Sequence, residues 1–230
     1  MQRIFHTPEG VRDIYSQECS RKQKLQEKLH RVFHQYGFED IETPTFEYFE
    51  VFSKEVGTIP SRDLYKFFDR EGNTLVLRPD FTPSVSRACA TYFNPEKEVV
   101  SLCYTGNTFI NNSSFRGRLK ETTQMGVERM GDDSPEADAE ILAMTVECLL
   151  ATGLTEFQVS VGQVDYYKAI FAQTGLSQEE EEELRELISQ KNYFGVEELV
   201  KNKNMDKSLA RVLSQLPQMF GSTEVLEKAK

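Results

Sequence analysis

Residues 75–83 contain polar side chains at a spacing that suits the binding of a small charged molecule. A predicted strand ends at Arg78, and Asp80 and Thr82 follow at the start of a predicted helix. A carboxylate in that position can accept hydrogen bonds from an amino group, and a threonine hydroxyl can contact the same ligand. Either side chain can instead cap the helix, which is the simpler structural interpretation.

Residues 124–128 form a second candidate site. Because side chains alternate along a strand, Gln124, Gly126 and Glu128 share one face. A glycine between a glutamine and a glutamate leaves room for a small polar ligand, if that face is not open to solvent.

A third candidate is a basic loop next to Gly117. The cations Arg116, Arg118 and Lys120 suit contact with a phosphate or a carboxylate, although an exposed loop tip has the same composition.

The sequence offers no nucleophile with a neighbouring base. His30 and His34 stand four apart in a predicted helix, but no HExxH or carboxylate pattern accompanies them, so we predict no metal site and no cofactor.

Composition limits the class of partner. The 230 residues carry a formal net charge of −10, which makes nucleic acid an unlikely partner. The four cysteines show no CxxC spacing, as is typical of free thiols in a reducing compartment. The sequence shows no signal segment and no apolar run of membrane-spanning length, so we expect no membrane partner and a cytoplasmic protein.

Periodicity predicts an α+β fold in which helices flank a mainly antiparallel sheet. Pro44 closes the first predicted strand, and a helical appendage follows the core. The predicted domains are residues 1–162 and 163–230. The predicted strands are 38–43, 65–68, 74–77, 99–105, 121–130 and 157–161, and the predicted helices are 16–36, 83–93, 134–152, 165–174 and 178–191.

The order of these motifs resembles the core of class II aminoacyl-tRNA synthetases, in the histidyl-tRNA synthetase branch. The resemblance covers about residues 5–162 and implies a dimer formed through the segment that ends at Pro44. It also implies that Asp80, Thr82, Gln124 and Glu128 match the histidine-contacting positions. The matching segments are Gly10-Val-Arg-Asp-Ile14, Phe38-Glu-Asp-Ile-Glu-Thr-Pro44 (motif 1), Leu77-Arg-Pro-Asp-Phe-Thr-Pro83 with Arg87-Ala88, Gly106–Glu128 (motif 2) and Asp138-Ala-Glu140.

Two positions depart from that pattern. The family's substrate-gripping arginine, directly after the phenylalanine of motif 2, is replaced by Ile110, and its ATP-contacting glutamate by Asn112. An isoleucine cannot stabilise the charge of a phosphate undergoing substitution, which typically supplies several kcal/mol of catalysis. The third characteristic motif of class II synthetases, motif 3, is not recognisable in the sequence either. The resemblance therefore predicts loss of aminoacylation.

The sequence is also similar to the ATP phosphoribosyltransferase regulatory subunits, which are non-catalytic paralogues of that branch. The similarity lies in Arg78-Pro-Asp-Phe-Thr-Pro83 and in residues 161–177 with the acidic helix that follows. It implies a homodimer within a hetero-oligomer, a short catalytic subunit as partner and histidine as effector. Members are longer, so we expect an N-terminal part of a longer chain, with 163–230 an insertion. A divergent histidyl-tRNA synthetase and a tRNA- or protein-binding relic remain alternatives.

Overall fold

The computed structural model describes residues 5–53, 59–112, 117–203 and 205–229. The chain divides into two compact units, Met1–Gln158 and Val159–Lys230. The helices of the first unit are α1 (Ser16–Gln35), α2 (Glu50–Ser53), α3 (Thr82–Tyr92) and α4 (Pro135–Thr152). Its strands are β1 (Glu39–Asp40), β2 (Phe46–Tyr48), β3 (Lys66–Phe68), β4 (Thr74–Leu77), β5 (Val100–Phe109) and β6 (Glu121–Met130).

The centre of the first unit is the long antiparallel ribbon of β5 and β6. Its register runs from Val100 opposite Met130 to Phe109 opposite Glu121, and β1 adds a short parallel edge to β5. The sequence predicts both long strands, and the structure extends the first of them to Phe109. Apolar side chains point to both faces of β5, so each face needs a covering layer.

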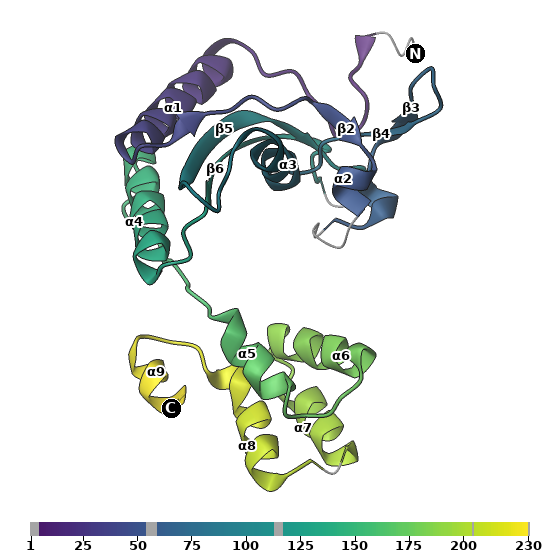
Figure 1. The fold of residues 1–230 in the computed structure, drawn as a ribbon, viewed down its shortest axis with the longest axis vertical. Coiled ribbons are helices and arrows are strands. Elements are labelled where there is room, and N and C mark those ends of the chain that lie inside the picture. The colour runs from purple at the N-terminus through teal and green to yellow at the C-terminus, as the bar shows by residue number, and fades with distance from the viewer. Residues whose placement is uncertain (1–4, 54–58, 113–116, 204, 230) are drawn as a thin grey trace. The chain divides into compact units, whose positions relative to one another are not determined.

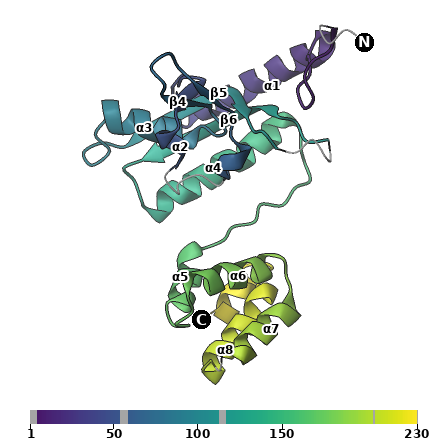
Figure 2. The ribbon, with the colours of Figure 1, turned by 90° about the vertical axis from the view of Figure 1, so that its right-hand side faces the viewer.

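Helices supply these two layers. Val32 and Phe33 of α1 pack with Met144 of α4 and with Cys103 on one face of the ribbon. Val85 of α3 belongs to the hydrophobic cluster on the other face. Figures 1 and 2 show α1 and α4 side by side, with the ribbon between them and α3. The predicted α+β architecture, with helices flanking a mainly antiparallel sheet, is confirmed.

The clearest predicted helix, α4, has the expected ends. Ser134 accepts a hydrogen bond from the Ala137 amide, Pro135 occupies the first turn, and Gly153 ends the helix with a left-handed backbone. These are the residue types that satisfy unpaired amides at a helix start and tolerate positive φ at its end.

A second sheet has the strand order β2-β4-β3, with antiparallel pairs throughout. The hairpin of β3 and β4 is predicted correctly, whereas β2 is missed. In β2 the aromatic residues Phe46 and Tyr48 are exposed, and Glu47 between them is buried. This reverses the usual alternation, and an ion pair makes it possible, because the Arg87 guanidinium lies 2.7 Å from the Glu47 carboxylate.

Two predicted strands differ in the structure: the strand predicted at 38–43 is shorter, and the one predicted at 157–161 does not form. Of residues 38–43, only Glu39–Asp40 forms a strand. The carbonyl of Thr43, at the far end of the range, accepts a hydrogen bond from the Arg78 side chain and not from a neighbouring strand. Pro44 therefore lies in the connection to β2 rather than at a strand end. Residues 157–161 alternate like a strand but pair with no strand of the described chain, and Val161 is 72% exposed.

The second unit is helical in its described part. Its core contains Leu184, Val196 and Leu213, each fully buried. The Glu179–Glu183 run lies on α6, whose buried residues are Leu184 and Ile188. The helices are α5 (Val164–Phe171), α6 (Gln178–Ser189), α7 (Tyr193–Asn202), α8 (Lys207–Gln215) and α9 (Glu224–Ala229). Within the described ranges of the whole chain, no helix is long and apolar enough to cross a membrane.

Candidate functional site

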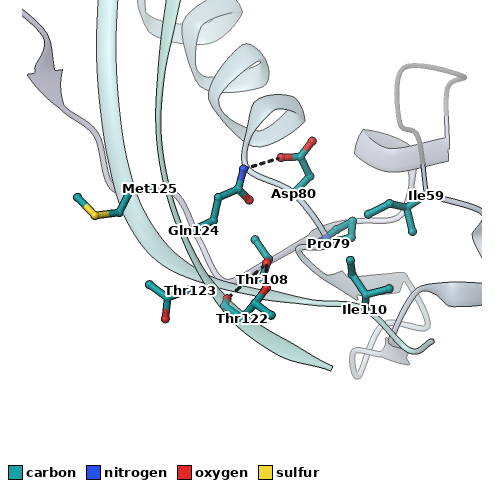
Figure 3. A pocket seen from close by; sticks show the side chains of 9 residues that line it. All are labelled: Ile59, Pro79, Asp80, Thr108, Ile110, Thr122, Thr123, Gln124 and Met125. Carbon is teal, nitrogen blue, oxygen red and sulfur yellow. Dashed lines mark hydrogen bonds between the residues drawn. The ribbon is translucent and has the colours of Figure 1, made fainter. Parts of the chain in front are cut away.

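A pocket of about 520 Å³ opens between β5, β6 and the start of α3. Asp80 and Gln124 lie together, and the Thr108 and Thr122 hydroxyls form a hydrogen bond of 3.0 Å across the two strands (Figure 3). Asp80 is the only charged side chain among the described residues that line it. The other lining residues are Ile59, Pro79, Ile110, Thr123 and Met125.

Asp80 lies two residues before the start of α3. One of its carboxylate oxygens accepts from the Phe81 amide at 2.6 Å and the Thr82 amide at 3.4 Å. The same oxygen lies 3.4 Å from the Gln124 side-chain nitrogen. The N-cap residue of α3 is Phe81, and no side chain makes a cap hydrogen bond there, so neither Asp80 nor Thr82 serves as the predicted helix cap. The second oxygen of Asp80 points away from Gln124 in Figure 3.

Glu128 completes the polar cluster beneath Asp80. The Thr82 hydroxyl donates to Glu128 at 2.6 Å, and the Tyr104 hydroxyl lies 3.4 Å from the same oxygen. Burial raises the pKa of the Glu128 carboxyl, and the nearby charge of Asp80 acts in the same direction. The hydrogen bonds from Thr82 and Tyr104 oppose this shift. The structure therefore brings the four predicted pocket residues, Asp80, Thr82, Gln124 and Glu128, into one hydrogen-bonded group.

The sequence analysis did not identify Tyr104, which occupies the space expected for a ligand next to Gly126. A Cβ atom on Gly126 would lie 2.4 Å from the Tyr104 hydroxyl oxygen. The Tyr104 ring stacks on Phe81, with ring centroids 4.3 Å apart. Burial raises the Tyr104 pKa, and the charges of Glu128 and Asp80 raise it further. The residue pairing of β5 with β6, which places Tyr104 opposite Gly126, is the signal that identifies it.

Arg78 is buried beside this stack rather than offered to a ligand. Its guanidinium lies 4.0 Å from the centre of the Phe81 ring. Its nitrogens donate to the carbonyls of Asn107 at 2.8 Å and Thr43 at 2.9 Å. Gly106 provides the room, because a Cβ there would lie 2.5 Å from an Arg78 nitrogen.

Ile110 marks the apolar end of the pocket. Figure 3 shows it gathered with Ile59 and Pro79, away from Asp80. The Asn112 side-chain oxygen is buried and lacks a hydrogen-bond partner among the described residues. Among the residues that the structure describes, none at this end of the pocket offers a cation to an anionic group.

The predicted basic loop is only partly described. Arg116 lies outside the described residues, and Arg118 is exposed next to Gly117, which has a φ of 67°. The Lys120 amine lies 3.4 Å from the Asn111 side-chain oxygen. The anion-binding role of Arg116 and Arg118 stays a prediction.

Comparison with known proteins identifies the architecture around this pocket. A family model described as histidyl-tRNA synthetase matches residues 10–230. The chain belongs to the histidyl-tRNA synthetase family. It shares the class II synthetase-like fold of that family, as the sequence predicts.

Within the histidyl-tRNA synthetase family, the chain is similar to proteins named ATP phosphoribosyltransferase regulatory subunit. The one from Acetivibrio thermocellus is 42% identical over 226 residues, covering 98% of this chain and 54% of that protein. The one from Ruminiclostridium cellulolyticum is 39% identical, again over 98% of this chain and 54% of its own. The chain thus spans about half the length of these curated relatives.

A solved structure supports the same similarity. A crystal structure of an ATP phosphoribosyltransferase regulatory subunit/histidyl-tRNA synthetase from Bacillus halodurans C matches with a TM-score of 0.87 and 32% identity. The match covers 98% of this chain and 59% of that one. Both units described above therefore have counterparts in a known member of the histidyl-tRNA synthetase family.

Replacing Glu128 by glutamine should make this family member more stable at neutral pH. A carboxyl whose pKa is raised by folding favours the native state only while it is protonated. Stability should therefore fall as pH rises from about 4.5, the ordinary glutamate value, through the raised pKa. The E128Q variant lacks this fall, and its amide oxygen can still accept from Thr82. Urea unfolding at several pH values measures the difference, with the exposed Glu96→Gln as the matched control. Equal pH dependence in wild type and E128Q would contradict the prediction.

Proposed function

We propose that this chain acts as the regulatory subunit of ATP phosphoribosyltransferase, activating a separate, short catalytic subunit and enabling feedback inhibition by histidine. The observation that carries the proposal is the similarity to proteins of that name, at 42% and 39% identity over 98% of the chain. The catalytic subunit joins ATP to phosphoribosyl pyrophosphate in the first step of histidine biosynthesis. This chain does not itself perform the reaction.

The pocket supports a non-catalytic role. Adenylation places negative charge on a phosphate in the transition state, and enzymes stabilise it with cations or donors at that point. Ile110 stands where the synthetase pattern has its arginine, and its neighbours in the pocket are Ile59 and Pro79. A side chain without charge or donors provides no such stabilisation. We therefore expect no aminoacyl adenylate to form.

Asp80 and Gln124 line the opposite end of the pocket, and Thr82 and Glu128 lie next to them in the same hydrogen-bonded group. Asp80 and Glu128 can together attract an ammonium or imidazolium group, and Thr82 and Gln124 add neutral hydrogen-bonding partners. Burial raises the pKa of the Glu128 carboxyl, and carboxyl groups with such shifted pKa values are concentrated in binding and catalytic sites. Histidine is the ligand that the proposed role predicts here. Alternatively, histidine binds at the interface with the catalytic subunit, and this pocket is a relic.

Regulation requires two states with different affinities for histidine. An effector shifts activity only by the difference between its affinities for the two assembly states. We propose that the states are arrangements of a hetero-oligomer that contains a homodimer of this chain. The segment around Pro44 matches the dimer-forming motif of the family.

Adding the chain to a short-form catalytic subunit should raise the rate of phosphoribosyl transfer to ATP, and histidine should then lower it. Continuous assays at increasing ratios of the two proteins measure both effects, and the catalytic subunit alone is the reference. No stimulation at any ratio would contradict the proposed function. Pyrophosphate exchange into ATP on addition of histidine would favour the divergent synthetase instead.

The E128Q variant tests where histidine binds. If the pocket holds the effector, losing a charged hydrogen-bonding group should raise the half-inhibiting histidine concentration by roughly tenfold or more. Stimulation without histidine should remain, and Glu96→Gln should behave like the wild type. Unchanged histidine sensitivity in E128Q would assign the effector to another site and leave the stimulation result intact.

A further inference from the structure

Four potential metal ligands meet at the end of α1, outside the pocket described above. His30 and His34 lie one turn apart on α1, Asp40 belongs to β1, and Cys103 lies on the neighbouring strand β5. Their ligand atoms all lie within 4.8 Å of one another. The sequence alone favours no metal at the histidine pair because the carboxylate and the thiol come from other elements.

The contacts within the group are short and converge on Asp40. One oxygen of its carboxylate lies 2.5 Å from Nε2 of His30, and the other lies 3.0 Å from Nε2 of His34. The Cys103 sulfur lies 3.5 Å from the first of these oxygens. The two imidazole rings have centroids 4.1 Å apart. Both histidines therefore present the same nitrogen toward one point.

The surroundings suit an ion that enters from solvent. Cys103 is fully buried and forms the floor of the group. The side chains of His30, His34 and Asp40 are 40%, 46% and 60% exposed, so the outer side is open. Exposed carboxylates and histidines often form simple ion pairs, but such pairs do not require a buried thiol at the same point.

We propose that His30, His34, Asp40 and Cys103 form a binding site for zinc or a similar divalent transition-metal ion. Two imidazole nitrogens, one carboxylate oxygen and one sulfur are a donor set that zinc accepts in tetrahedral geometry. Hard ions such as magnesium and calcium prefer oxygen ligands and fit this set poorly. Tetrahedral zinc holds nitrogen and oxygen ligand atoms roughly 3.3 Å apart. Zinc would therefore move the Asp40 oxygens away from both histidines, most of all from His30, and take the place of the direct hydrogen bonds.

The site would connect three elements of the first unit. A metal held by α1, β1 and β5 links the helix to the sheet edge, and only the native chain brings these ligands together. Zinc should therefore stabilise the folded chain, because a ligand that binds only the native state shifts the unfolding equilibrium.

Titration of the metal-free chain with zinc against a chromophoric chelator tests the proposal. We expect one equivalent to bind and the unfolding temperature to rise. Cobalt, used as a spectroscopic substitute, should give the intense visible bands of a tetrahedral site and a thiolate charge-transfer band. Absence of stoichiometric zinc binding would overturn the site, and cobalt binding without the thiolate band would overturn the four-ligand assignment.

Single substitutions assign the ligands. His34→Gln and Asp40→Asn change exposed side chains, so folding should be unaffected. Loss of a direct ligand should weaken zinc binding by at least the roughly ten- to hundredfold observed for outer-shell partners. His6→Gln is the matched control, since His6 is exposed and is the third histidine of the sequence. Zinc affinity that is equal in H34Q, D40N and H6Q would place the ion elsewhere and overturn the proposal.

Discussion

Replacing Arg78 by methionine should destabilise the first unit by roughly 2–6 kcal/mol, because at least two backbone carbonyls lose their donors and each such loss typically costs about 1–3 kcal/mol. A third carbonyl, that of Pro44, lies 3.4 Å from the guanidinium. Only 7% of Arg78 is exposed, so water cannot replace the missing donors at the carbonyls of Thr43 and Asn107 without a rearrangement. The guanidinium also lies over the Phe81 ring, and methionine retains only part of that contact.

The position of Arg78 explains why the effect should extend beyond one contact. Its own carbonyl accepts from the Phe109 amide at 3.0 Å, and its amide donates to the Thr45 carbonyl at 2.9 Å. Side chain and backbone thus connect the end of β4 with β5 and with the segment before β2. The backbone bonds remain in the variant, whereas the side-chain bonds to Asn107 in β5 and to Thr43 before β2 are lost, so we expect an effect on both sheets.

Hydrogen exchange resolved by segment, together with urea unfolding, measures the loss in R78M. Exchange should accelerate in β4, β5 and the segment around Thr43, and it should be unchanged in the second unit. Arg62→Met is the matched control, because 84% of the Arg62 side chain is exposed and the change should stay within about 0.5 kcal/mol. Equal stability of R78M and R62M would refute the proposed role of Arg78.

Replacing Gly126 by alanine should destabilise the chain by about 1–3 kcal/mol, the usual range for inserting atoms into a packed site. The new Cβ would lie 2.4 Å from the Tyr104 hydroxyl oxygen and 2.6 Å from the carbon that carries it. Tyr104 would have to leave its stack on Phe81, and its hydroxyl would lose the contact with Glu128. The loss therefore affects both packing and the polar group of the pocket.

A double-mutant cycle separates this effect from the intrinsic effect of alanine in a strand. Combined with Tyr104→Ala, the G126A substitution should cause much less additional loss than it causes alone, because the clash has gone. Gly162→Ala is the matched control, since a Cβ at Gly162 meets nothing within 4 Å. Additive effects of G126A and Y104A in urea unfolding would show that the close approach to Tyr104 is unimportant.

The sequence predicts those elements whose side-chain pattern and end residues agree. For α4, the N-cap serine, the proline and the final glycine all give the same boundaries. For β2 the pattern misleads, because Glu47 is buried by its pairing with Arg87, which lies 40 residues further along. Residues 157–161 alternate correctly, but a strand also needs a neighbour to pair with, and local pattern does not supply one.

In the candidate site, too, some residues can be predicted from local sequence and others cannot. Asp80, Thr82, Gln124 and Glu128 are recognisable because each belongs to a local motif. Tyr104 is not, since its importance arises only when β5 and β6 pair and place it opposite Gly126. The cluster of His30 and His34 with Asp40 and Cys103 is likewise unpredictable from local sequence, because Cys103 lies 63 positions after Asp40.

The fit of Tyr104 against Gly126 is possible only when β5 and β6 are aligned as they are here. Gly126 is the only glycine in β6, so sliding the two strands by one or two residues would bring a side chain against the tyrosine ring. The alignment of a hairpin is commonly set by its turn. Here the packing of Tyr104 against Gly126, inside the paired strands, also favours a single alignment. We therefore expect the two strands to keep this alignment when the length or composition of the connecting loop is changed.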